Sequence, residues 1–120
     1  MNGILWALLL NLLLTLAVEL GVAAIAGVRG SDLAILALIN CVTNPVVNYC
    51  FDWIWIWQNG QGAVPYICLA ALEVGVVAVE ALLFKKLLRY RKIKPLLLSL
   101  LLNGASFAAG ELVGLVISFL

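Results

Sequence analysis

The sequence contains no histidine, few charged residues and only three cysteines, and each shortage excludes a class of protein. Without histidine, neither an imidazole-based zinc site nor a histidine general base can form. Cys41, Cys50 and Cys68 form no CxxC pair and no recognisable ligand spacing, so we interpret them as small packing residues. Nucleophile-elbow and phosphate-loop motifs are also absent. We therefore expect a protein that is not an enzyme and needs no cofactor, and the sequence leaves metal binding open.

The shortage of charge also excludes a water-soluble domain. Charged residues make up 11% of the 120 residues and hydrophobic residues 66%, whereas a soluble domain has about 25% charged and about 45–50% apolar residues. The apolar runs are long and rich in leucine and alanine, which does not fit the alternating ten-residue segments of a membrane β-barrel. The composition therefore predicts an all-α integral membrane protein.

Four apolar runs fill the chain, and each is long enough to cross the hydrocarbon core of a bilayer, which takes about 20 residues. A tight polar turn at 29–32, a glutamine- and glycine-rich loop at 58–62 and a basic segment at 85–94 separate the runs. In the first turn, Ser31 or Asp32 is suited to cap the second helix. We expect a bundle of four transmembrane helices that forms one domain over residues 1–120, with helices at about 2–28, 33–57, 63–84 and 95–120.

The basic residues predict the orientation of the chain. All seven lie after the first or the third run: Arg29, Lys85, Lys86, Arg89, Arg91, Lys92 and Lys94. The positive-inside rule places both segments in the cytoplasm and both termini outside the cell membrane. Trp6, Trp53, Trp55 and Trp57 lie at the opposite level, where indole rings mark the outer interface. Because the basic cluster lies between two membrane crossings, we expect the lipid bilayer as its partner and no nucleic acid.

Two halves of the chain resemble each other. Ala17-Val18-Glu19 recurs as Ala78-Val79-Glu80, and the Asn40–Thr43 segment corresponds to Asn103–Ser106, each with a hydroxyl three residues after its asparagine. We interpret this as two helix-hairpin repeats, which would be related by a pseudo-twofold axis along the membrane normal. Chance similarity between leucine- and alanine-rich helices is the alternative.

Polar residues recur at helical spacing inside the runs, as in the Asn11, Thr15 and Glu19 series, so each helix has one polar face. An ionised side chain at the bilayer centre costs about 3 kcal/mol or more and faces the protein interior or water. No basic residue lies within the runs to neutralise these carboxyls. The candidate residues for binding a solute or ion are Glu19, Glu73, Glu80, Asn40, Asn44, Asn48 and Asn103, supported by Thr15, Thr43, Pro45 and Ser106.

Two functions fit this pattern. The polar residues could bind protons, a cation or a small solute in a transporter or channel, or they could serve only as hydrogen-bonding contacts between helices in a membrane scaffold. Gly110 and Gly114 form a GxxxG seam that favours a homo-oligomer, most simply a dimer, or that packs within the chain against Ala17 and Gly21. Glu111 lies about 100° around its helix from the Ser106 and Gly110 stripe, so we expect it to face a different cavity or a neighbouring subunit.

Overall fold

The computed structural model describes residues 2–59 and 61–120, so Met1 and Gly60 of the predicted 58–62 loop lie outside the description. Its helices are α1 (Asn2–Ile25), α2 (Ser31–Trp57), α3 (Val64–Leu87) and α4 (Pro95–Ser118). At a rise of about 1.5 Å per residue each spans about 36–40 Å, more than the roughly 30 Å hydrocarbon core. All four are long and apolar enough to cross a membrane. The predicted all-α bundle of four membrane-spanning helices is therefore confirmed.

The first helix ends at Ile25, three residues before the expected position. Gly27 has a φ of 105°, a conformation that glycine adopts without steric cost. Its N–H donates to the carbonyl of Ala24, and the N–H of Val28 donates to that of Ala23. This pair of hydrogen bonds is the Schellman motif, which satisfies the last carbonyls of a helix and stops it.

The expected side-chain cap of the second helix is wrong. Gly30 occupies the position before α2, and neither Ser31 nor Asp32 makes a capping hydrogen bond there. Asp32 instead binds the loop between α3 and α4, as described below. The third helix continues to Leu87 because lysines in its last turn favour the negative end of the helix dipole. Pro65 and Pro95 stand in first turns, where a missing N–H costs nothing.

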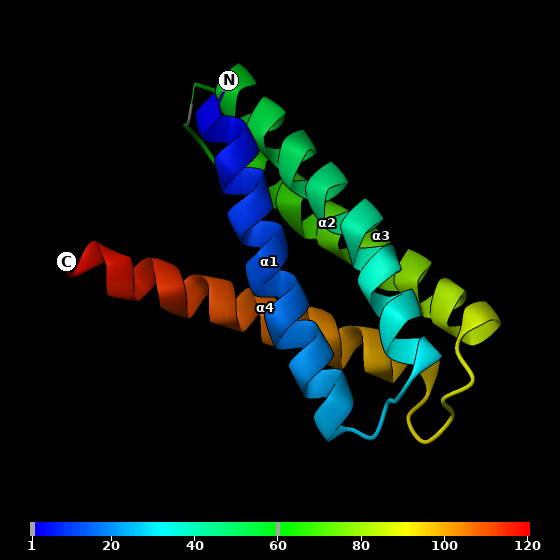
Figure 1. Cartoon of the computed structure of the whole chain (residues 1–120). Coiled ribbons are helices and arrows are strands. Elements are labelled where there is room, and N and C mark those ends of the chain that lie inside the picture. The colour runs from blue at the N-terminus through cyan, green and yellow to red at the C-terminus, as the bar shows by residue number, and fades with distance from the viewer. Residues whose placement is uncertain (1, 60) are drawn as a thin grey trace.

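The helices pack in a ring: each contacts the next in the chain, and α4 closes the ring against α1. Figure 1 shows α1, α2 and α3 running alongside one another, while α4 crosses them obliquely and its C-terminal half extends beyond the bundle. Every residue from 110 to 120 is accordingly exposed. The predicted pseudo-twofold repeat remains a prediction, because α4 diverges from the ring where its proposed counterpart α2 does not.

The apolar core lies at one end of the bundle. It is built from the last turns of α1 and α3, the segment that follows each of them, and the first halves of α2 and α4: Ala23, Val28, Leu36, Ile39, Phe84, Leu88, Leu98 and Leu102. Between membrane helices such side chains stabilise the fold by close van der Waals packing rather than by removal from water, because lipid tails are equally apolar. The chain is therefore packed tightly beside the two basic segments, and the helices are free to separate towards the other end.

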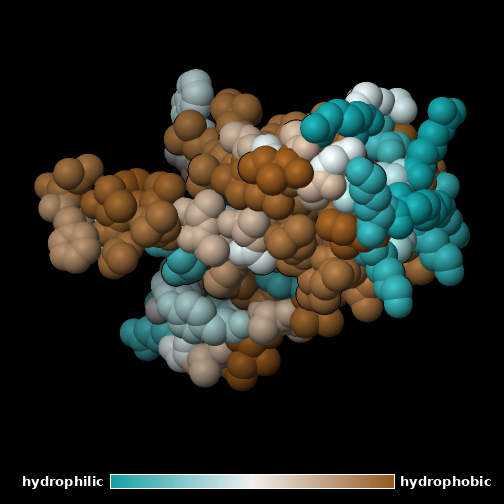
Figure 2. Space-filling view, turned by 90° about the horizontal axis from the view of Figure 1, so that it is seen from below, coloured by the Kyte–Doolittle hydropathy of each residue, from teal (hydrophilic) through white to brown (hydrophobic). Residues whose placement is uncertain are grey.

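Hydrogen bonds join the two connecting segments at this packed end. The Asp32 carboxylate accepts the backbone N–H of Arg89 at 3.1 Å and that of Tyr90 at 2.9 Å. The Tyr90 hydroxyl donates to the carbonyl of Ala26 at 2.7 Å. Seen from this end, most hydrophilic side chains gather on one side of the molecule, while the projecting end of α4 is mainly hydrophobic (Figure 2). Side chains such as Leu38 and Val74 are exposed along the outer helix faces, as lipid contact requires, and the chain has the form of an integral membrane protein.

Candidate functional site

A polar cavity of about 260 Å³ lies between the four helices. One water molecule needs about 10–15 Å³ measured in this way, so the cavity has room for several waters or a small solute. It brings together most of the residues expected at a binding site: Thr15, Asn40, Thr43, Asn44, Asn48, Glu73, Glu80, Asn103 and Ser106. Gly110, predicted as part of the packing seam, also lines it. The cavity extends from Glu80, beside the apolar core, towards Asn11 and Phe51 nearer the opposite end.

Two residues expected at the site, Glu19 and Pro45, lie outside its wall, as does Gly114 of the predicted packing seam. Glu19 is buried behind the cavity, with 1% of its surface exposed, and its carboxyl accepts a hydrogen bond of 3.3 Å from the Ser106 hydroxyl. Pro45 is half-buried within α2. Gly114 is exposed on the projecting part of α4. The Ser106 hydroxyl therefore links Glu19 to the cavity wall, and Gly114 belongs to a different feature.

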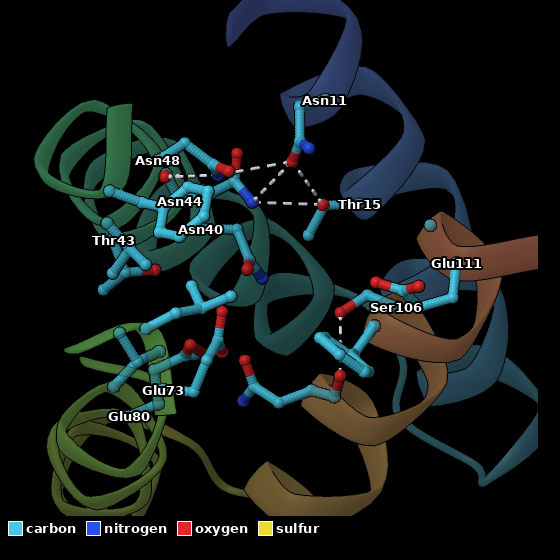
Figure 3. A pocket seen from close by; sticks show the side chains of 17 residues that line it. Asn11, Thr15, Asn40, Thr43, Asn44, Asn48, Glu73, Glu80, Ser106 and Glu111 are labelled. Atoms are coloured by element: carbon cyan, nitrogen blue, oxygen red, sulfur yellow. Dashed lines mark hydrogen bonds between the residues drawn. The ribbon is translucent and has the colours of Figure 1, made fainter. Parts of the chain in front are cut away.

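One wall is a network of amides and a hydroxyl from α1 and α2 (Figure 3). The Asn44 side-chain amide donates to the side-chain oxygens of Asn11 at 3.2 Å and Thr15 at 3.1 Å. The Asn48 amide donates to Asn11 at 3.3 Å and to the backbone carbonyl of Asn44 at 2.9 Å. Asn11 belongs to the same helical series as Thr15 and Glu19, and this spacing was the signal that could have placed it in the site. These four residues join α1 to α2.

The facing wall holds the carboxyl groups of α3. Figure 3 shows Glu73 and Glu80 on the opposite side of the cavity from Asn11 and Thr15. Glu73 is half-buried. Glu80 is 1% exposed, and neither of its carboxyl oxygens has a hydrogen-bond partner among the described residues. A buried polar group without a partner is rare in native proteins because it loses its hydrogen bonds to water without replacement.

Glu111 lines this same cavity, so the expectation that it faces a different cavity or a neighbouring subunit is wrong. Figure 3 shows Glu111 on α4 beside Ser106. Because α4 crosses the bundle obliquely, a wider arc of its surface faces the cavity than in a parallel bundle. The remaining wall is apolar and was not foreseen, since an apolar residue on an apolar helix carries no signal: Val47, Phe51, Leu69, Val76 and Phe107.

The ionisable side chains that line the site are all acidic. Among the described residues, its wall contains three glutamates and no lysine or arginine. The buried side-chain atoms that lack a hydrogen-bond partner in the described chain are all oxygens: Glu19 Oε2, Asn44 Oδ1, Glu80 Oε1 and Glu80 Oε2. The site therefore has unused acceptors and negative potential, which favour positively charged groups and hydrogen-bond donors.

The small-residue seam does not pack within the chain. A side-chain carbon added at Gly21, Gly110 or Gly114 would meet no atom of the described structure within 4 Å. The alternative in which this seam packs against α1 is therefore wrong, because α4 diverges before it reaches that surface. The GxxxG face is left uncovered on the projecting half of α4.

Comparisons with protein-family models, curated proteins and solved structures gave no match. The class of this protein consequently follows from its fold and site alone. It is an integral membrane protein whose four apolar helices form a bundle around a polar, acidic cavity.

Proposed function

We propose that this protein is a small membrane transporter or channel that moves an ion or small solute across the cell membrane. One observation carries the proposal: the buried Glu80 carboxyl faces an internal polar cavity with both oxygens unpartnered among the described residues. Ionisable residues within a membrane face the protein interior and mark ion or substrate pathways. A carboxyl that only held helices together would use its oxygens for contacts between them.

The direction of the cavity also supports transport. It is closed beside Glu80 by the apolar core and the joined loops, and it extends towards Asn11 and Phe51 near the other end. The positive-inside rule assigns the basic loops to the cytoplasm. In this orientation both termini and the part of the cavity lined by Asn11 lie towards the outside, and the apolar core lies between the cavity and the cell interior. Such a cavity is what one state of an alternating-access carrier requires.

Flux measurements in proteoliposomes test the proposal. With proton, sodium or potassium gradients, we expect the wild-type chain to conduct or exchange ions above the level of empty vesicles. Glu80→Gln removes the ionisable group with little change of shape, so flux should fall at least tenfold, and Glu73→Gln should reduce it less. Asp52→Asn is the matched control, because this carboxyl lies near the end of α2 outside the cavity wall, and its flux should equal that of wild type. If the folded Glu80→Gln variant kept wild-type flux, Glu80 would not be part of the transport pathway.

The second candidate function is a membrane scaffold that binds other membrane proteins. The exposed GxxxG face of α4 favours it, since such seams let helices approach closely. Wild-type protein that shows no flux under any of these gradients, and no uptake of a small organic solute, would favour the scaffold.

A further inference from the structure

We propose that the cavity binds a small organic cation, an alkylammonium with a short apolar tail. Its N–H groups would donate to Glu80, and its tail would contact the apolar wall. This inference names the class of solute that the proposed transporter would carry. It rests on the proposed function only where it assigns transport as the role of the site.

The charge of the cavity requires a cation. Glu73, Glu80 and Glu111 line it, and no basic side chain of the described chain does. Bringing an anion here would add repulsion to the cost of removing it from water. A cation instead replaces part of the hydration that Glu80 has lost.

The unpartnered atoms require hydrogen-bond donors. Three of them belong to residues of the cavity wall, namely both oxygens of Glu80 and the side-chain oxygen of Asn44. A primary ammonium carries three N–H donors on one positive centre, so at Glu80 a single group supplies both the charge and the donors that the two carboxyl oxygens lack.

A metal ion fits these walls poorly. The described residues contain no group of three or more histidine, cysteine, aspartate or glutamate side chains arranged to hold a metal. Calcium takes six to eight oxygen ligands at about 2.3–2.6 Å, which would fill a small part of the roughly 260 Å³ available. The space is better matched to an organic molecule.

The apolar part of the wall is where the tail of the alkylammonium would bind. Phe51, Leu69, Val76 and Phe107 line the same cavity as the carboxyls. Leu69 and Phe107 also line an apolar groove between α3 and α4, together with Glu73 and Asn103. The carboxyl-lined cavity thus adjoins an apolar surface. Aromatic side chains attract cations by their π faces and methylene groups by burial, so the site favours a cation that is itself partly apolar.

Equilibrium binding to purified full-length protein in detergent tests the inference without any transport step. In calorimetric titrations, we expect n-butylammonium to bind saturably at one site per chain. Butan-1-ol has the same tail without the charge and should not bind. Tetramethylammonium has the charge without N–H donors and should bind at least tenfold more weakly, and potassium at equal concentration should not compete.

Two substitutions separate the parts of the site. Glu80→Gln should weaken n-butylammonium binding at least tenfold, and Phe107→Ala should reduce the preference for n-butylammonium over methylammonium. Asp52→Asn should leave both unchanged. Elution volume and thermal midpoint establish that each variant is folded, and the ligand series on wild-type protein stands without any variant.

Equal binding of butan-1-ol, or no saturable binding of n-butylammonium to folded wild type, would overturn the inference. Flux of protons or inorganic cations without n-butylammonium binding would leave a transporter with a different solute. Binding without any flux would keep the site and refute the transport function.

Discussion

At the scale of single residues, the buried polar groups divide into two sets with different chemistry. Thr15, Asn44 and Asn48 donate to the Asn11 side-chain oxygen, and Asn44 also donates to Thr15, so these residues join α1 to α2. Glu80 has no such partner in the described chain. The first set makes the hydrogen-bonding contacts between helices that the polar stripes suggested, and the role of Glu80 as a binding group stays a prediction.

Asn44 provides the test of the first set. Asn44→Leu removes two hydrogen bonds to α1, and interhelical hydrogen bonds in membranes contribute about 0.6–2 kcal/mol each. We expect the free energy of unfolding in detergent to fall by about 1–2 kcal/mol, measured with a chemical denaturant. Val42→Leu is the control, because Val42 is exposed on the same helix and the same residue is introduced. Equal stability of the two variants would show that the amide network contributes nothing.

At the scale of elements, the Asp32 side chain stabilises the packed end of the bundle, although the sequence suggested it as a helix cap. Asp32 was expected to cap α2, but it holds the backbone of the loop between α3 and α4. Hydrogen bonds to a charged acceptor contribute about 1.5–3 kcal/mol each when formed inside a protein. The bonds tie the first hairpin to the second beside the apolar core, where the cavity is closed.

Removing this carboxylate should open the loop before it unfolds the helices. In Asp32→Ala, the N–H groups of Arg89 and Tyr90 lose their acceptor, and local opening exposes the backbone to protease. We expect trypsin to cut after Arg89 and Arg91 at least fivefold faster than in wild type. Ser31→Ala is the control, since Ser31 is exposed and makes no capping hydrogen bond. Unchanged cleavage in Asp32→Ala would mean that the loop is held by its apolar contacts alone.

At the scale of the whole molecule, the two ends of the bundle differ. The basic end is closed by buried leucine, isoleucine and phenylalanine side chains, while the other end widens because α4 turns away. The projecting half of α4 is apolar and uncovered, and it carries Gly110 and Gly114 on one face. A second copy of this chain could pair its own α4 along that face, which is the dimer predicted from the GxxxG spacing.

Dimer formation through α4 can be measured by the mass of the protein in detergent, using light scattering with correction for bound detergent. We expect wild type to be a dimer and the double substitution of leucine for Gly110 and Gly114 to be a monomer, because the larger side chains hold the backbones apart. Gly75→Leu is the matched control, since Gly75 is an exposed helical glycine with open space around it. If the wild-type protein were a monomer, the prediction that the GxxxG seam forms a dimer would be wrong.

The sequence by itself determined the membrane class, the four helices and most of the cavity residues. Those properties follow from local rules: apolar length sets a crossing, and a spacing of four places Asn40 and Asn44 on one face. Local rules also located the breaks, although Gly27 ended α1 earlier than the apolar run suggested, because its φ sets the stop.

Only the tertiary structure decided how the four helices meet. The oblique crossing of α4 put Glu111 into the cavity, moved Gly114 out of the bundle and left Glu19 behind Ser106. Because the two loops lie side by side, Asp32 binds the loop between α3 and α4 instead of capping α2. These features depend on helix crossing and on contacts between residues far apart in the chain, and spacing along one helix carries no information about either.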